Sequence, residues 1–259
     1  TDEATARMAS ENVPELLVSL FVKLQKPIPN ARTSRTLEMR VRAKDGVLED
    51  LPSAGAQRSE RVGEGEILIK VDLDQPVPAT DAERSDPRYR SPSALADAAD
   101  ETVSKLTTQA LRGLESAPTR HQAERLRSAV AMHISNKGLS TGFASATETA
   151  KSKAGDCSEH AVLLVAMLRS AGIPARGATG LVYVEGYQGA PHAFGWHMWS
   201  QALVDGVWID LDATLPRAYD AAHLLTATTP LDGATMDRDI AGLLQLMGDL
   251  DITIREEGS

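Results

Sequence analysis

Apolar residues in the middle of the chain recur every three or four positions, which is the spacing of α-helices. One such stretch covers residues 95–114, and a second covers residues 120–134 after a break at Pro118. A short helix or turn is expected over residues 146–153. Residues at this spacing share one face of a helix, so the pattern predicts helices that pack on a common core.

Strict alternation of apolar and polar residues predicts strands near the start of the chain. Over residues 35–43, Leu37, Met39 and Val41 fall on one face and polar residues on the other. Residues 13–24 and 66–73 are further candidate strands. One apolar and one polar face are typical of a small antiparallel β unit.

The segment 75–93 is rich in proline, aspartate and arginine, which favours a linker or an extended connection. We therefore expect residues 1–90 to form an N-terminal antiparallel β unit plus linker. Residues 91–259 would form the main body of the protein. A helix around residues 243–247 and an alternating strand over 250–254 would end this part, and the strand would pair with the N-terminal β unit.

One buried helix is predicted to begin at Cys157, the single cysteine of the chain. Asp156 has the character of an N-cap and Glu159 that of its capping-box partner. Residues 161–168 are apolar throughout, and such a helix runs through a core rather than over its surface. Free amide groups and the helix dipole stabilise an anion at this end, so the cysteine thiolate is favoured there.

A β-hairpin is predicted around Asp205-Gly206, a dipeptide typical of two-residue type I′ turns. Pairing the strands outward from this turn places Trp199 opposite Asp212. Because side chains alternate across a strand, His197 shares that face and becomes the diagonal neighbour of Asp212. A shift of the register by one residue would place the two side chains on opposite faces.

Cys157, His197 and Asp212 are the groups that nucleophilic catalysis at a carbonyl requires. The thiol would attack, the imidazole would take and return its proton, and the carboxylate would orient the imidazole. Each residue also has a plainer interpretation: a buried apolar cysteine, a structural histidine and a carboxylate at a strand end. Their combined placement favours a catalytic triad.

Four motifs in this order resemble the transglutaminase-like superfamily, over about residues 120–216. They are GDC at 155–157 with the following helix, LRSAGIPAR at 168–176, HMW at 197–199 and WIDLDAT at 208–214. The similarity is closest to bacterial transglutaminase-like proteins described as cysteine proteases. It implies an α+β, papain-like fold, in which the buried cysteine helix packs against an antiparallel sheet and residues 91–259 form the catalytic core. It also implies that Cys157 is the nucleophile, His197 the general base and acid, and Asp212 the third member.

Three other histidines compete with His197 for the role of the base. His192 lies out of alternation with His197, and no aspartate at a suitable offset supports it. His160 is a helical neighbour of Cys157, where a cation is disfavoured, so we expect it to shape the pocket or to be structural. His133 is interpreted as structural. Trp196 and Trp199 join His160 as candidate pocket or substrate-binding residues.

An oxyanion hole needs at least two donors, and the backbone amide of Cys157 is a natural first one. Some transglutaminases use a tryptophan well upstream of the cysteine as the second. This chain has tryptophans only at positions 196, 199 and 208, so that donor is missing, and Asn136 is a weak alternative. The departure weakens the case for protein cross-linking more than the case for acyl chemistry.

Composition restricts the partners. The formal net charge of -9 and the lack of a basic stripe argue against nucleic acid. One cysteine with scattered histidines does not make a structural zinc site, no calcium loop is evident, and we expect no cofactor.

No apolar stretch has membrane-spanning length. The first residue is not methionine, which fits a removed signal peptide or a shortened chain, and a periplasmic or secreted location is slightly favoured over a cytoplasmic one.

The sequence therefore favours thiol-dependent acyl transfer or hydrolysis at amide bonds, through an acyl-cysteine intermediate. Water as acceptor would make a protease or amidase, an amine acceptor would make a transglutaminase, and we favour hydrolysis. The substrate would be a protein or peptide. The alternative is a non-catalytic binding or scaffolding module on the same fold. Substrate identity and oligomeric state stay open.

Overall fold

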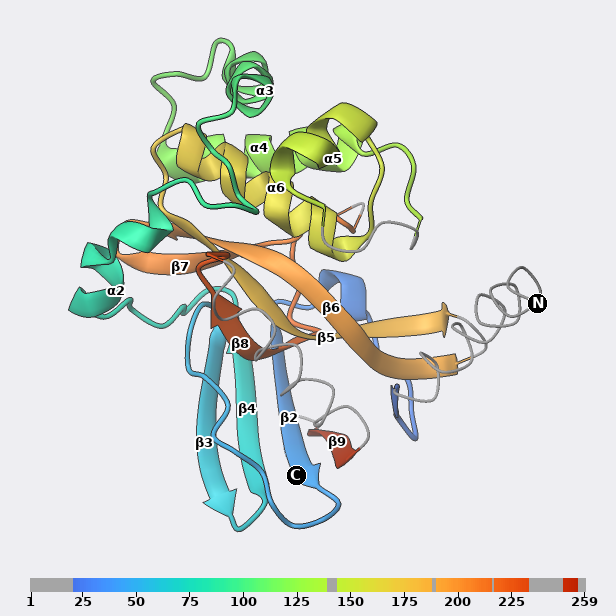
Figure 1. Cartoon of the computed structure of the whole chain (residues 1–259). Helices are drawn as coiled ribbons and strands as arrows, with labels where there is room; N and C mark the ends of the chain where they lie inside the picture. The colour runs from blue at the N-terminus through green and yellow to red at the C-terminus, as the bar shows by residue number, and fades with distance from the viewer. Residues whose placement is uncertain (1–20, 139–143, 188–189, 216, 233–248, 256–259) are drawn as a thin grey trace, which may run out of the picture.

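The computed structural model describes residues 21–138, 144–187, 190–215, 217–232 and 249–255. These residues form three layers (Figure 1). Helices cover one face of a central antiparallel sheet, and a second antiparallel sheet packs against its other face. The expected α+β fold, with the cysteine on a buried helix against an antiparallel sheet, is confirmed.

The helical layer consists of α3 (Glu101–Leu111), α4 (Thr119–His133), α5 (Ala146–Ser152) and α6 (Cys157–Ser170). Three of these agree with the sequence pattern within two residues. Helix α3 starts later than predicted, because the side chain of Asp100 caps it by accepting from the amides of Thr102 and Val103. The expected linker also contains α2 (Asp81–Ser85) and the 3₁₀ turn η2 (Pro87–Tyr89), which the sequence pattern did not predict.

The central sheet has the order β1-β6-β5-β8, with β7 also paired to β6. Its strands are β1 (Val22–Lys23), β5 (Ala175–Tyr187), β6 (Ala190–Val204), β7 (Val207–Leu211) and β8 (His223–Thr229). Strand β8 was not predicted. The strand expected over residues 13–24 is described only from residue 21 onward. There Val22 pairs with Phe194 of β6, so β1 belongs to the central sheet, not to the N-terminal β unit.

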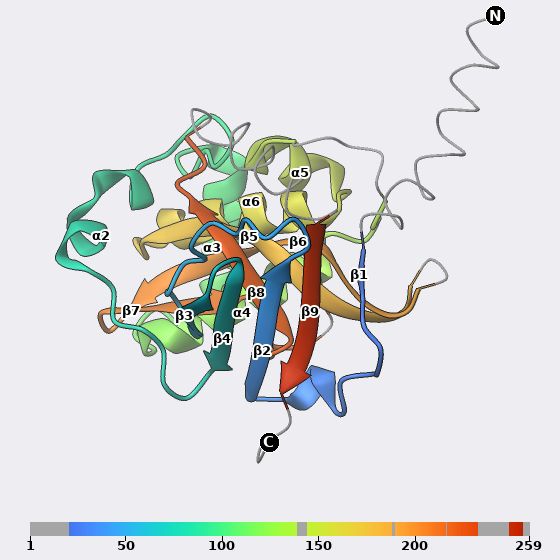
Figure 2. The same cartoon turned by 90° about the horizontal axis from the view of Figure 1, so that it is seen from below.

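The second sheet has the order β3-β4-β2-β9 (Figure 2). Its strands are β2 (Thr36–Ala43), β3 (Gln57–Gly63), β4 (Glu66–Asp72) and β9 (Leu250–Arg255). Met39 of β2 pairs with Ile254 of β9, which confirms the predicted pairing of the last strand with the N-terminal β unit. The helix expected around residues 243–247 lies outside the described residues. The division of the chain at residue 90 stays a prediction.

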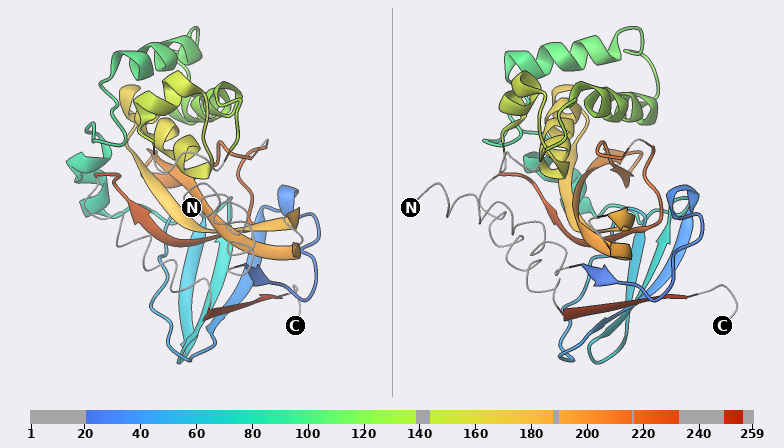
Figure 3. Two further views of the ribbon diagram at one scale, coloured as in Figure 1. Left: turned by 45° about the vertical axis from the view of Figure 1, so that its right-hand side comes forward. Right: turned by 90° about the vertical axis from the view of Figure 1, so that its right-hand side faces the viewer.

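Helix α6 is the centre of the larger core. Every residue from Ser158 to Arg169 is buried, as expected for a helix that is apolar on nearly every side. It is enclosed by α3, α4 and α5 and lies against β6, as Figure 3 shows from two sides. A buried helix of this kind holds its first residue, Cys157, in a defined place against the central sheet.

Gly180 of β5 lies where the backbone of β8 leaves no room for a side chain. A Cβ at this position would lie 1.9 Å from the carbonyl oxygen of Leu224 in the neighbouring strand β8. Because a backbone oxygen cannot swing away, Gly180→Ala should lower the free energy of unfolding by about 3 kcal/mol, measured by urea denaturation. Gly63→Ala is the matched control, since its Cβ would meet nothing closer than 3.7 Å. Equal urea midpoints for the two variants would contradict this account of the sheet.

Candidate active site

Cys157 is the first residue of α6 and is half-buried. The predicted capping box is present: Asp156 accepts from the amide of Ser158, and Glu159 accepts from the amide of Asp156 at 2.9 Å. Gly155 makes room for this arrangement, because a Cβ there would lie 2.3 Å from the Cβ of Glu159. The sequence Gly-Asp-Cys therefore places a half-buried cysteine at the start of an otherwise buried helix.

The hairpin between β6 and β7 has the predicted register. Val204 pairs with Val207 and Gln201 with Asp210, and both Asp205 and Gly206 adopt the positive φ angles of a type I′ turn. On the resulting shared face, His197 Nε2 lies 2.8 Å from Asp212 Oδ2. Asp212 is fully buried and His197 is 5% exposed. The two side chains that the register argument brings together are thus in direct contact.

Electrostatics favour charged forms of this pair. Burial by itself lowers the pKa of His197, but the charge and hydrogen bond of Asp212, with the adjacent Cys157 side chain, raise it to about 9. Burial likewise works to raise the pKa of Asp212, yet contacts with two histidines hold it well below its usual value. The contact with Asp212 therefore favours a protonated His197 beside a charged carboxylate at neutral pH.

The three candidate pocket residues have different surroundings. Trp199 is buried, stacks on the ring of His197 with centroids 6.2 Å apart, and donates from Nε1 to Asp210. His160 is buried with Nδ1 2.6 Å from the carbonyl oxygen of Asp156. Trp196 is half-buried where the two large cores approach each other. Their contact with a substrate stays a prediction.

The other candidates of the sequence analysis lie outside this contact network. His133 Nε2 lies 2.7 Å from the carbonyl oxygen of Ala150, a backbone contact that fits the structural interpretation. His192 lies on β6 opposite Glu185. Asn136 is exposed, and its backbone oxygen accepts from the amide of Gly155, next to the capping box. A role of Asn136 as second oxyanion donor stays a prediction.

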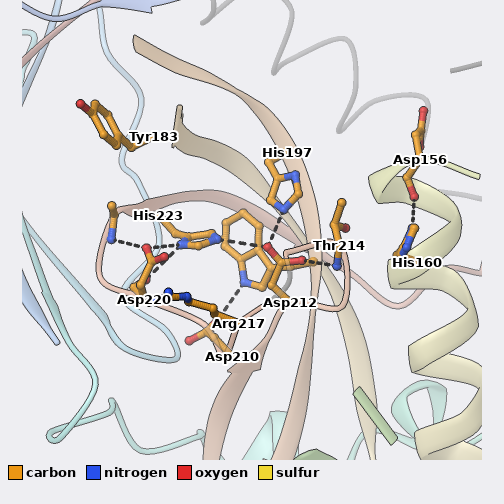
Figure 4. A network of polar contacts seen from close by, with 12 residues as sticks. Asp156, His160, Tyr183, His197, Asp210, Asp212, Thr214, Arg217, Asp220 and His223 are labelled. Atoms are coloured by element: carbon orange, nitrogen blue, oxygen red, sulfur yellow. Dashed lines mark hydrogen bonds and ion pairs between the residues drawn. The ribbon is translucent and has the colours of Figure 1, made fainter. Parts of the chain in front are cut away.

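A second histidine, His223, was missed by the sequence analysis. It is fully buried at the start of β8, with Nε2 3.4 Å from Asp212 Oδ2 and Nδ1 3.2 Å from Asp220 Oδ1. Figure 4 shows it between the two carboxylates, with the His197 ring directed at the same oxygen of Asp212. The spacing Asp220-x-x-His223 after the fourth motif was the available signal, but it has meaning only once β8 is placed.

Among the described residues, one group of side chains has the geometry to share a cation. The ligand atoms of His197, Asp212 and His223 all lie within 4.8 Å of one another. Both imidazoles already face the same carboxylate oxygen, and all three groups are buried. We therefore interpret the group as a hydrogen-bonded network.

The raised pKa values of His197 and His223 make the stability of the protein depend on pH. Both His197 and His223 have pKa values raised from 6.5 to about 9, because contacts with carboxylates outweigh burial. Their contribution to stability is complete below pH 6.5, the unfolded value, and is lost as the pH rises through about 9. The urea midpoint should thus fall between pH 6.5 and 9.5, and should fall less in a His223→Gln variant. Parallel pH profiles for the two proteins would contradict the assignment.

The region that carries the site is similar to a known protein family. The sequence profile of the transglutaminase-like superfamily matches residues 105–213, which include Cys157, His197 and Asp212. The resemblance of the four motifs to this superfamily is thereby confirmed for this part of the chain. A search of curated proteins finds no match.

Two solved structures are similar to this chain at low sequence identity. A proposed cysteine protease from Cytophaga hutchinsonii has 14% identity, a TM-score of 0.48, and coverage of 86% of this chain and 83% of its own. The periplasmic domain of TgpA from Pseudomonas aeruginosa, bound to ethylmercury, has 14% identity, a TM-score of 0.42, and coverage of 78% of this chain and 94% of its own.

Within the described residues, no helix has both the length and the apolar character needed to cross a bilayer. A periplasmic or secreted location stays a prediction.

Proposed function

We propose that this protein is a cysteine enzyme that attacks amide bonds of proteins or peptides through an acyl-Cys157 intermediate, and that water releases the acyl group. The observation that supports this most directly is the buried His197–Asp212 pair, joined at 2.8 Å, whose imidazole also interacts with the thiol at the start of α6. A thiol, a base and an orienting carboxylate are the components of a nucleophilic triad.

The contact of His197 with Asp212 supports a separate role for each ring nitrogen in this proposal. Nε2 is held by Asp212, so Nδ1 is the atom left to exchange a proton with Cys157. The thiolate adds to the amide carbonyl, and the imidazolium then protonates the leaving nitrogen, which leaves a thioester and a neutral imidazole. That imidazole next takes a proton from a water molecule, whose oxygen adds to the acyl carbon; the C–S bond breaks, the acid leaves, and the thiolate and the imidazolium are restored.

Hydrolysis is favoured over amine transfer for a reason in the sequence. Tryptophan occurs only at positions 196, 199 and 208, so the upstream tryptophan that supplies an oxyanion donor in some transglutaminases has no counterpart. The amide of Cys157 is the first donor in this proposal, since amides of the first helical turn have no partner inside the helix. The second donor stays unassigned.

The test is to incubate the protein with a denatured protein mixture, with and without a dansylated primary amine, and to follow products by mass spectrometry. New peptide ends or glutamine deamidation that vanish in Cys157→Ala would support hydrolysis. Amine incorporation faster than either would make the protein a transglutaminase. No product, together with the alkylation behaviour of an ordinary thiol, would overturn the proposal in favour of a binding module.

A further inference from the structure

His223 has a carboxylate on each side of its ring. Nδ1 faces Asp220 at two oxygens, the backbone carbonyl at 3.0 Å and Oδ1 at 3.2 Å. Nε2 faces Asp212 Oδ2 at 3.4 Å. A neutral imidazole has one donor and one acceptor nitrogen, so it would set a lone pair against a carboxylate on one side. With a carboxylate oxygen facing each nitrogen, the geometry favours a doubly protonated ring.

The surroundings of His223 are those of a buried cation. The half-buried ring of Tyr219 lies over it with centroids 4.2 Å apart, and Trp199 meets it edge to face at 5.4 Å. Aromatic faces attract cations. Burial lowers the pKa of His223, but the hydrogen bonds and charges of Asp212 and Asp220 outweigh it and raise the pKa to about 9.

Asp212 is constrained through the same contacts. Its Oδ1 accepts from the amide of Thr214 at 2.8 Å, and its Oδ2 lies between the Nε2 atoms of His197 and His223. At the far end, Asp220 is itself anchored, since its Oδ2 lies 3.0 Å from Arg32 Nη1. A row of alternating charges thus leads from Arg32 through the two carboxylates to His197 (Figure 4 shows its buried part).

We propose that His223 is a positioning residue of the active site: as an imidazolium held between Asp220 and Asp212, it orients the carboxylate on which His197 is aligned. This inference rests on the proposed function, because it assigns His223 a task in supporting the Cys157–His197 pair. His223 does not touch the reacting atoms.

Loss of the positive charge on His223 should make formation of the Cys157 thiolate less favourable. The titratable groups around His223 are Asp212, Asp220, Asp210, Tyr219 and His197, with Arg32 beyond Asp220. Removal of the His223 cation leaves a surplus of negative charge beside His197, and a freer Asp212 holds His197 less well. Both effects disfavour the thiolate, so both move its formation to higher pH.

The experiment measures the rate of iodoacetamide alkylation of Cys157 from pH 4.5 to 9 in wild type and His223→Gln. The glutamine keeps a donor for Asp212 and removes the charge. We expect the acid limb of the rate profile to move up by about one pH unit. His121→Gln, at an exposed position on α4, is the matched control and should leave the profile in place. A purely structural role would change the overall rate without moving the limb, and that result would overturn the inference.

A second measurement does not depend on how well the variant folds. In wild-type protein labelled with ¹⁵N-histidine, the ring nitrogen shifts of His223 at pH 7.5 should be those of an imidazolium, and a neutral tautomer would overturn the inference. The two proposals fail separately. A wild-type alkylation profile of an ordinary thiol would count against the proposed function, whereas the nitrogen shifts report on His223 alone.

Discussion

Replacing His197 with alanine is expected to turn Cys157 into an ordinary thiol. An imidazolium beside a thiol favours the thiolate, whereas a free thiol of pKa ~8.5 is less than about 1% ionised at pH 6. Because a thiolate of low pKa is also a weaker nucleophile, the expected loss is smaller than the change in ionisation. Alkylation by iodoacetamide at pH 6 should be about tenfold slower in the variant, as followed by mass spectrometry.

His192→Ala is the matched control for this experiment, because His192 lies on the same strand, β6, and was the rival base. It should leave the alkylation rate at pH 6 unchanged. If instead His192→Ala slows the reaction and His197→Ala does not, the assignment of the base is wrong. If neither variant changes the rate, Cys157 has no imidazole partner and the thiol enzyme is excluded.

Replacing Asp212 with alanine should be the most destabilising change in the site. The carboxylate is fully buried and serves His197, His223 and the amide of Thr214 together. Its removal leaves two imidazoles beside each other without their shared acceptor, with ring centroids 5.9 Å apart. Loss of one partner from a buried charged pair costs about 3–5 kcal/mol, so the urea midpoint at pH 7 should fall steeply.

A second variant and a second pH test whether lost charge contacts cause this loss of stability. Asp212→Asn keeps an acceptor for Thr214 and the shape of the side chain, and should lose less stability than the alanine variant. The penalty of Asp212→Ala should also shrink above pH 9, where both imidazoles are neutral in the wild type. A penalty that is the same at pH 7 and pH 10 would mean that packing, not charge, accounts for the loss.

Local signals explain which parts of the site could be predicted from sequence. The dipeptide Asp205-Gly206 sets the hairpin register, and the register alone brings His197 to Asp212. The start of α6 follows from a capping box and an unbroken apolar run. In both cases the decisive interactions lie within about fifteen residues along the chain, where turn and helix-end chemistry is well defined.

Long-range pairing explains what could not be predicted. Strand β3 is almost wholly polar, and it is a strand because β4 supplies its partner. Strand β8 shows no simple alternation, so its first residue, His223, had no assigned place. The contact between His223 and Asp212 depends on the path of the chain between β7 and β8, which no periodicity in the sequence specifies.

The pairing of β9 with β2 has a consequence for biosynthesis. Met39 and Val41 emerge early from the ribosome, whereas their partners Ile254 and Ile252 are made only after the whole active-site core has been translated. Until then β2 has an open apolar edge, which is the kind of surface that recruits other chains. The second sheet is therefore the last part of the fold that can be completed, and this edge of β2 stays open until β9 has been made.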